Sequence, residues 1–492
     1  MSKNLNNIST MSKLQRNIIL FTCAISIFIT QVDFTGLNVT LPRIQSELGA
    51  STSELQWIGD IYTVVIASLI MLTASLGDKF GRKRVLLIGV SIFGLASLAG
   101  ALAPNPTWLI LARAFQGLGS AMMPAIALAI INNVFLDPGE RARAVGVWGT
   151  MIGLGAAAGP VIGGLLSWIA GWQGIFWLNV PLSVLGLVAI VISVPESRAA
   201  KSRPIDWPGQ ALMLVGLGSM TYAIIALGEG KTDVLTWALL VAGILALVAF
   251  VLVEAIVKFP MVDLKFFRSI PFATAGLLAF LFFFTYAGFM FIATLLLQEP
   301  APGLAFTPLV AGLLMVPLAL ANAAGSSISG RTLEKTGNRV PLLVGAALQL
   351  VLALLLLALP LAGSGDSATA AILALFLVAS VLMGASVGLA NPALITTALS
   401  GMPKDQSGVA GATVSIFRQT GLTIGVAVLG AIMNFGTRAR GESIAVAAQP
   451  GWWLVALIAI VAALLAIFAT TRHALATQQA ATASFAGEPS EV

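Results

Sequence analysis

Long apolar runs recur along this chain of 492 residues and limit what it can fold into. An α-helix needs about 20 apolar residues to cross the hydrocarbon core of a membrane. Only 9% of the residues are charged, against about 25% in soluble domains. The fold class is therefore an all-α polytopic membrane protein. Its predicted spans lie near residues 17–41, 55–76, 84–103, 108–132, 144–168, 174–194, 208–228, 234–253, 271–297, 308–329, 340–361, 369–392, 408–434 and 452–471.

The distribution of basic residues supports this count. An even number of spans puts both termini on one side, which we take as the cytoplasm. Twenty of the 26 Lys and Arg residues then lie in cytoplasmic segments and four in outer loops, as the positive-inside rule requires. The remaining two, Arg113 and Arg418, lie inside predicted spans. The first apolar run is not closed by a small-residue cleavage site, so it predicts a retained span rather than a signal peptide.

A single cysteine, Cys23, and a single histidine, His473, restrict the chemistry available to the chain. A lone cysteine excludes an intramolecular disulfide and a Cys-cluster metal site. A lone histidine argues against a His-based zinc site and a Ser-His-Asp triad. The sequence also lacks a Gly-x-x-x-x-Gly-Lys-Ser/Thr phosphate loop. We therefore expect no enzyme activity, catalytic residue, metal or cofactor, and no nucleic-acid partner.

A charged loop separates the second and third predicted spans and reads Gly77-Asp78-Lys79-Phe80-Gly81-Arg82-Lys83-Arg84. Its glycines permit a tight loop between helix ends, and Asp78 lies where a second charged element could pair with it. Topological charge alone would explain the basic residues but not the glycine spacing. We therefore predict a conformational role for Gly77, Asp78, Gly81 and Arg82.

Polar stretches suggest how the chain is divided into domains. Residues 195–206 follow the sixth span, and residues 254–269 precede the ninth. A weak echo of the charged loop lies between spans 10 and 11, as expected for a transporter built from repeats; it consists of Gly330, Glu334, Gly337 and Arg339. The predicted parts are a cytoplasmic segment 1–16, a six-helix bundle 17–194, a linker with two spans 195–269, a second six-helix bundle 270–471 and a cytoplasmic tail 472–492.

Polar side chains interrupt the first and fourth predicted spans. By helical rise, Asp33 lies about 12 Å from the outer end of span 1 and Arg113 about 8 Å below the outer surface in span 4. Gln116 shares the face of Arg113 one turn further on. Intramembrane ionisable residues mark functional sites by default. An arginine stays charged whereas a carboxylate can be protonated, so Asp33, Arg113 and Gln116 are predicted to couple protons. The alternatives are a structural aspartate hydrogen-bonded to a neighbouring helix and a permanent structural ion pair.

Glycines recur along the fifth predicted span, which reads Gly149-x3-Gly153-x-Gly155-x3-Gly159-Pro160-x2-Gly163-Gly164. This spacing makes a smooth helix face that permits close backbone packing. Pro160 removes one backbone hydrogen bond and can kink the helix. Packing alone would explain any one glycine pair, but the full run indicates a conformational role. We assign that role to Gly155, Gly159, Pro160 and Gly163.

Candidate substrate contacts are aromatic and polar residues on the spans. The walls of an apolar pocket are predicted at Phe34, Trp57, Phe284, Tyr286 and Phe289, with polar contacts at Asn38, Asn322 and Asn391. Aromatic residues on spans also face lipid or pack as core, which is the alternative for each of them. Carboxylates attract organic cations, so Asp33 and Asp60 are candidates to hold a cationic substrate. Asp60 could equally be a surface charge, because it lies near a span boundary.

The motifs above, in their order and in their spans, resemble those of the major facilitator superfamily. The charged loop is similar to its signature between spans 2 and 3. The segments Asp33-Phe34-Thr35 through Leu41-Pro42, Arg113-x2-Gln116-Gly117-x-Gly119 and the span 5 run resemble motifs of its fourteen-span drug:proton antiporter branch, the EmrB/QacA type. Arg418-Gln419-x-Gly421 extends the resemblance to span 13. Trp172-Gln173-Gly174-Ile175-Phe176 departs from it, because the arginine and second tryptophan usual before Ile-Phe are missing.

The resemblance implies the major facilitator fold, with two six-helix bundles plus two extra linking helices, working by alternating access. It further implies that the protein exports lipophilic, cationic drugs or toxic compounds across the cytoplasmic membrane, with the proton gradient as energy source. The expected partners are protons, a small-molecule substrate and the lipid bilayer, and a monomer is expected. One alternative is a dedicated exporter of one metabolite or antibiotic. Another is a non-transport sensor or scaffold, which would not need costly intramembrane charges.

Overall fold

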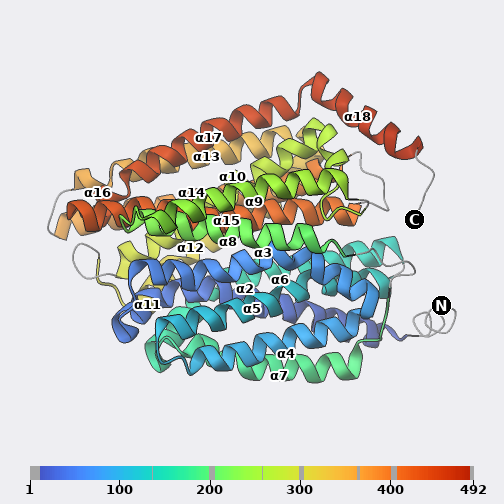
Figure 1. Cartoon of the computed structure of the whole chain (residues 1–492), viewed down its shortest axis with the longest axis horizontal. Helices are drawn as coiled ribbons and strands as arrows, with labels where there is room; N and C mark the ends of the chain where they lie inside the picture. The colour runs from blue at the N-terminus through green and yellow to red at the C-terminus, as the bar shows by residue number, and fades with distance from the viewer. Residues whose placement is uncertain are drawn as a thin grey trace. The chain divides into compact units, whose positions relative to one another are not determined.

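The computed structural model describes residues 11–135, 137–198, 205–257, 259–298, 304–362, 366–400 and 407–487. All regular secondary structure in these residues is helical (Figure 1). Parts of three predicted segments, residues 1–10, 199–204 and 488–492, lie outside the described residues, as does the side chain of Glu334. The predicted all-α class is confirmed.

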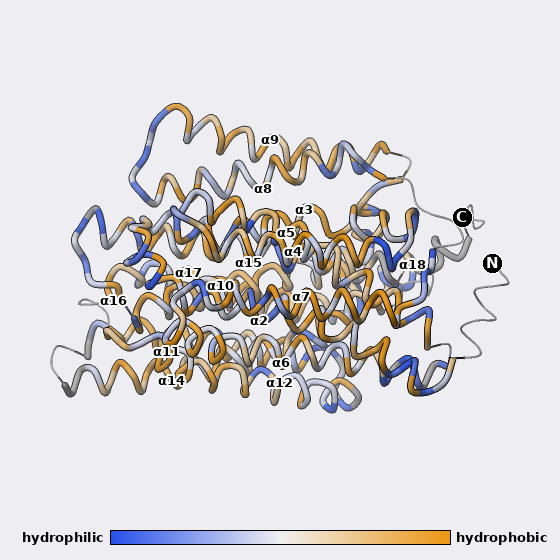
Figure 2. The backbone as a smooth tube through the Cα atoms, turned by 90° about the horizontal axis from the view of Figure 1, so that it is seen from below, coloured by the Kyte–Doolittle hydropathy of each residue, from blue (hydrophilic) through white to orange (hydrophobic). Residues whose placement is uncertain are grey.

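Among the described residues, 14 helices are long and apolar enough to cross a membrane, and each predicted span overlaps one of them. Hydrophobic residues extend along these helices, and hydrophilic residues gather near their ends (Figure 2). Contacts group the chain into two compact units. The first unit is Met1–Leu214 with Val257–Met261, and the second is Val215–Ile256 with Val262–Val492.

The first unit contains six long helices and the start of a seventh. Helix α2 begins after a capping box in which Ser12 and Gln15 bond to each other's backbone N–H, and α3 begins with the same arrangement of Ser51 and Glu54. The helices are α2 (Lys13–Leu48), α3 (Thr52–Phe80), α4 (Arg82–Ala101), α5 (Pro106–Val134), α6 (Pro138–Ala170), α7 (Gly174–Ser193) and the first turns of α8 (Trp207–Gly228).

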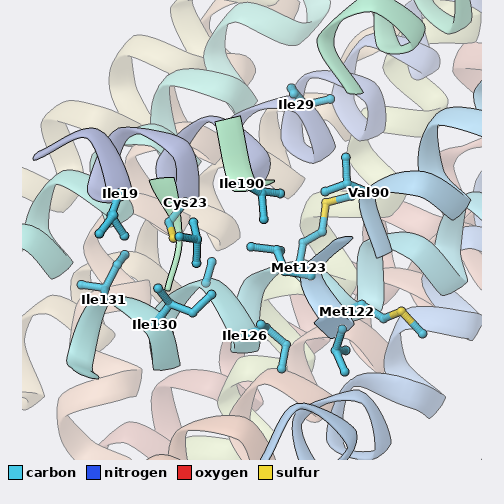
Figure 3. Close-up of a cluster of buried hydrophobic side chains, with 14 of the residues drawn as sticks. Ile19, Cys23, Ile29, Val90, Met122, Met123, Ile126, Ile130, Ile131 and Ile190 are labelled. Atoms are coloured by element: carbon cyan, nitrogen blue, oxygen red, sulfur yellow. The ribbon is translucent and has the colours of Figure 1, made fainter. Parts of the chain in front are cut away.

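The part of the first unit around the start of α2 is held by a cluster of buried hydrophobic side chains. Ile19 and Cys23 of α2 face Ile130 and Ile131 of α5, and Ile190 of α7 lies between them and the α4 side chains (Figure 3). Cys23 is fully buried and free, so it behaves as a small apolar residue.

Among its described residues, the second unit contains the rest of α8 and ten further α-helices, with two short 3₁₀ helices. The elements are α9 (Val234–Ile256), η1 (Leu264–Arg268), α10 (Ile270–Gln298), α11 (Pro308–Leu314), α12 (Val316–Thr336), α13 (Arg339–Leu357), η2 (Leu359–Ala362), α14 (Asp366–Leu399), α15 (Ser407–Arg440), α16 (Ile444–Ala447), α17 (Gln449–Ala469) and α18 (Arg472–Gly487). Inside this unit, α12 packs on α14, α10 on α15, and α13 on α17.

Helix α18 occupies most of the segment that we predicted as a cytoplasmic tail. Its Thr477 hydroxyl accepts a hydrogen bond of 3.1 Å from the backbone N–H of Ile270, at the start of α10. Ala474 and Ala481 of the same helix are buried. The run of Ala, Gln and Thr is therefore a helix docked on the second unit, which its weak apolar pattern did not indicate.

The glycines of α6 let it pack directly on α2. A Cβ at Gly155 would lie 2.8 Å from the Cβ of Gln31, and one at Gly159 would lie 2.9 Å from the backbone N of Gly36. At Gly163 a Cβ would collide with the backbone carbonyl of Gly36. Backbone atoms cannot move aside as a flexible side chain can, so these positions require glycine.

Substituting Gly163 should therefore destabilise the first unit. We expect Gly163→Ala to lower the melting temperature of the purified protein, with a cost of about 1–3 kcal/mol typical of overpacking. Gly153→Ala is the matched control, because a Cβ there meets no atom within 4 Å on the same helix. Equal melting temperatures for the two variants would contradict the close packing of α6 on α2.

Candidate functional site

A fully buried ion pair lies inside the first unit. Arg113 Nη1 donates to Asp33 Oδ2 at 2.6 Å, and both side chains are 0% exposed. The pair joins α2 to α5, which are 80 residues apart in sequence at these positions. Two charges removed from water are tolerated when they pair and when hydrogen bonds satisfy their remaining atoms.

The second carboxylate oxygen of Asp33 accepts from two amides. Asn179 Nδ2 of α7 donates to Oδ1 at 2.6 Å, and Gln116 Nε2 of α5 donates to the same atom at 3.3 Å. Gln116 also accepts from Arg113 Nη1 through Oε1 at 2.8 Å. Asp33, Arg113 and Gln116 therefore form one closed network, completed by Asn179 from a helix that sequence reasoning had not connected to them.

The network extends to α3 and α4. Gln116 Nε2 lies 2.7 Å from the Ser97 hydroxyl of α4, and Arg113 Nε donates to the backbone carbonyl of Ile58 at 3.1 Å. The Arg113 guanidinium carbon lies 4.3 Å from the centroid of the Tyr62 ring, within cation–π range. Five helices thus contribute to the site, which we call the Asp33 network.

Two polar atoms of the Asp33 network have no hydrogen-bond partner among the described residues. They are Arg113 Nη2 and Asn179 Oδ1, both buried. A buried donor and a buried acceptor without partners each cost about 1–3 kcal/mol. The network is therefore incompletely satisfied in this state, which leaves capacity for a rearranged set of bonds.

Small residues on α5 position the two donors. A Cβ at Gly117 would lie 2.8 Å from the carbonyl oxygen of Tyr62 on α3, and one at Gly119 would lie 2.6 Å from the backbone N of Phe93 on α4. Because α5 approaches both helices so closely, Arg113 reaches the α3 backbone and Gln116 reaches Ser97. The sequence Arg-x2-Gln-Gly-x-Gly thus supplies the polar groups together with the packing that orients them.

The other candidate residues of the first unit lie beside this network. Phe34 stacks on Tyr62 with ring centroids 6.0 Å apart, while Asn38 donates its amide to the Phe34 carbonyl on its own helix. Trp57 is half-buried. Asp60 is 1% exposed and its Oδ2 has no hydrogen-bond partner among the described residues. The surface-charge alternative for Asp60 is therefore wrong.

The candidates of the second unit do not form one cluster. Phe289 is in the core, stacked on Phe376 at 6.1 Å and next to Trp452, whereas Phe284 packs near Phe280. Tyr286 is 8% exposed and lies against Phe283. The remaining two candidates, Asn322 of α12 and Asn391 of α14, are half-buried. Their role in binding stays a prediction.

The charged loop is fixed by residues on both of its sides. Arg82 donates to Asp78 Oδ1 at 2.9 Å, one turn earlier on α3. Glu196, after α7, accepts from the backbone N–H of Lys83 at 3.1 Å and lies 3.6 Å from Arg84. Gly81 has a φ of 115° and gives α4 no side-chain cap. The Glu196 carboxylate therefore caps α4 from a distant segment, where negative charge also favours the helix dipole.

Sequence reasoning missed Asn179, Ser97 and Glu196. Asn179 had a detectable signal, because it is a polar residue in the otherwise apolar run Gly174-Ile175-Phe176-Trp177-Leu178-Asn179-Val180. Ser97 had none, since single serines are common in spans. Glu196 lies in a charged loop, where a topological role is the default reading.

Comparisons with known proteins agree on one family. The model of the Major Facilitator Superfamily matches residues 23–426 and, in a second alignment, 278–487. Multidrug resistance protein Stp of Mycobacterium tuberculosis is 35% identical over 84% of this chain and 75% of its own. Puromycin resistance protein pur8 of Streptomyces alboniger is 35% identical over 83% of this chain and 80% of its own. The tetracenomycin C resistance and export protein of Streptomyces glaucescens is 31% identical over 84% of this chain and 75% of its own.

Solved structures show the same fold. A bacterial homolog to the human lysosomal transporter Spinster, in an inward-facing and unoccupied conformation, matches with a TM-score of 0.62 and 17% identity. That match covers 98% of this chain and 100% of the other. A mutant of nucleoside transporter NupG matches with a TM-score of 0.61 and 14% identity, covering 92% and 100% of the two chains.

Removing one charge of the Asp33–Arg113 pair should destabilise the folded protein more than removing both charges together. We expect Arg113→Gln to lower the melting temperature strongly, because it leaves the Asp33 carboxylate buried without a counter-charge, at about 3–5 kcal/mol. Combining it with Asp33→Asn should recover part of that loss. Thermal unfolding of the purified variants in one detergent measures both. Simple additivity of the two losses would contradict a direct interaction.

The carboxylate of Glu196 should protect the first turn of α4. We expect Glu196→Ala to speed amide hydrogen exchange in residues 82–86, with a loss of about 1 kcal/mol typical of a removed helix cap. The start of α5 serves as an internal reference, because the Asn105 side chain caps it locally by accepting from Trp108 N–H at 2.9 Å. Unchanged exchange at α4 would show that Glu196 is not its cap.

Proposed function

The chain belongs to the major facilitator superfamily of membrane transporters, and on that premise we propose that it exports lipophilic, cationic small molecules in exchange for protons. The observation that carries the proposal is the Asp33 network, a fully buried ion pair with partly unsatisfied partners inside membrane-spanning helices. The relatives named above for drug resistance and export support outward transport of drug-like molecules.

Protonation of Asp33 is the proposed coupling step. If the Asp33 carboxyl became neutral, the Arg113 guanidinium would stay charged but lose its counter-charge. Arg113 Nη2 already lacks a hydrogen-bond partner among the described residues, so the arginine would be less well satisfied still. An isolated buried charge is far less stable than a paired one, so the helices that carry the two groups would be driven to rearrange. Gln116 contacts both members of the pair and can redistribute its hydrogen bonds as Asp33 changes charge.

The proposed mechanism is alternating access. Moving one charge across the membrane potential is worth about 2.3 kcal/mol per 100 mV, so inward movement of protons can drive outward movement of substrate. The Gly155–Gly163 face of α6 and the loop from Gly77 to Arg82 are the proposed conformational elements. The protein would act in the cytoplasmic membrane, as a monomer with both termini in the cytoplasm.

Asp60 is the proposed contact for positive charge on the substrate. It is buried on α3, two residues from Tyr62, and one carboxylate oxygen has no hydrogen-bond partner among the described residues. The ring of Phe34, which stacks on Tyr62, provides an aromatic face in the same unit. Carboxylates and aromatic faces are the groups that attract organic cations.

A second candidate function is export of one dedicated metabolite or antibiotic by the same mechanism. The names of two relatives, one for puromycin resistance and one for tetracenomycin C resistance and export, favour it. A sensor or scaffold role is disfavoured, because such a protein needs no costly intramembrane charges.

Proton coupling can be tested in proteoliposomes that hold a pH gradient. Monovalent and divalent organic cations and neutral drugs are added in turn to vesicles containing the wild type or Asp33→Asn. We expect at least one cation to collapse the gradient with the wild type and to have no effect with Asp33→Asn. Glu47→Gln, which changes an exposed carboxylate on the same helix, should behave like the wild type.

This experiment also distinguishes broad drug export from dedicated export of one compound. Collapse of the gradient by several unrelated cations supports broad export, whereas a response to one compound only supports dedicated export. Gradient-driven transport by Asp33→Asn at the wild-type rate would contradict the assignment of Asp33 as the coupling residue.

A further inference from the structure

A second intramembrane arginine, Arg418, differs sharply from Arg113 in its surroundings. It lies on α15 in the second unit, within the candidate membrane span Ala410–Arg438. Its guanidinium carbon lies 5.5 Å from the centroid of the Phe283 ring on α10. Over the part of the chain that the structure describes, Arg418 forms neither an ion pair nor a hydrogen bond. Its side chain is half-buried rather than enclosed.

A charge in this position needs an acceptor. An arginine has five N–H donors in a planar fork that matches the two oxygens of a carboxylate. A cation–π contact supplies about 0.5–2 kcal/mol but accepts none of those hydrogen bonds. Arginines inside membranes are rare and normally pair with an anion or with backbone carbonyls. The donors of Arg418 therefore suit an oxyanion that is not part of this unit.

The aromatic groups around Arg418 are also suited to such a ligand. Gln419 has a buried Oε1 without a hydrogen-bond partner, but this atom is an acceptor and does not suit an oxyanion. Tyr286 lies edge-on to the same Phe283 ring at 6.2 Å, and its hydroxyl likewise has no described partner. Aromatic rings beside unpaired donors are typical of sites for ligands with an apolar body and a few polar groups.

The packing of α15 on α10 brings Arg418 close to Phe283. A Cβ at Gly421 would collide with the backbone carbonyl of Phe280, and a Cβ at Gly425 would collide with that of Phe284. The two helices therefore touch through their backbones on either side of Phe283. This contact places Arg418 next to Phe283, so the guanidinium lies within reach of the ring.

The depth of Arg418 argues against a lipid headgroup as the ligand. It is eight residues into a span of 29 residues, or about 12 Å by helical rise, which places it about 5 Å inside a hydrocarbon core about 30 Å thick centred on that span. A lipid phosphate lies at the membrane surface, whereas a transported molecule passes through the interior.

We propose that Arg418 is an oxyanion-binding residue that recognises the carboxylate of lipophilic aromatic substrates, with Tyr286 as an additional donor. The proposal rests on the proposed function, because the ligand is the exported molecule. It extends the substrate class from cations to aromatic carboxylates, including zwitterions that carry both charges.

Matched ligands test the proposal on the purified full-length protein. Binding of 2-naphthoate and of its uncharged isostere 2-naphthamide is measured by titration calorimetry in nanodiscs of uncharged lipid. We expect the wild type to prefer the carboxylate by about tenfold or more. Arg418→Gln should abolish this preference, while Arg418→Lys should retain part of it, because a lysine keeps the charge but loses the bidentate geometry. Melting temperatures identify any variant that fails to fold.

The control is Arg438→Gln, which removes a half-exposed arginine of the same helix that lies 3.8 Å from Glu229. It should leave the preference unchanged. The proposal is overturned if the wild type shows no preference for the carboxylate, or if folded Arg418→Gln retains it. Proton-coupled export of cations without carboxylate preference would overturn this proposal alone, whereas carboxylate preference without proton-coupled export would overturn the proposed function alone.

Discussion

The absence of water from the hydrocarbon core is the constraint on which this structure depends. A polar group placed there without a partner costs several kcal/mol, so most polar groups in the spans pair with another part of the protein. Isolated hydroxyls meet the requirement locally: Thr22 and Ser26 of α2 each donate to the backbone carbonyl four residues earlier. Charged groups cannot be satisfied in this way, so Asp33 and Arg113 require a network from five helices.

The same constraint explains how much of the molecule could be predicted from sequence. The spans follow from the length of apolar runs, and Asp33, Arg113 and Gln116 stand out because ionisable residues are rare in such runs. Their contacts also follow in part, since Arg113 and Gln116 share one helix face. What could not be predicted is the set of partners on other helices. Asn179 and Ser97 reach the network through the rotation and depth of α7 and α4, which packing alone determines.

Glycine has a double role that a sequence pattern reveals only in part. The run in α6 was identifiable by its spacing, and its contacts with α2 agree with that pattern. Gly117 and Gly119 of α5 are equally close to their neighbours but belong to a short motif dominated by Arg113 and Gln116. There the glycines matter because they bring α5 near enough for the polar side chains to reach α3 and α4. Close packing and buried charge are thus two parts of one arrangement.

The two units satisfy their buried polar groups in different ways. In the first unit a charge pair is fully enclosed, and protonation can change its net charge. In the second unit the comparable buried contact is neutral, with Gln349 Nε2 donating to the Thr285 hydroxyl at 2.6 Å, while Arg418 has aromatic contact but no described acceptor. A permanent cation without a counter-charge cannot serve as a proton switch, because an arginine does not release its proton. We therefore propose recognition of negative charge as the role of Arg418, and protonation of Asp33 as the coupling step.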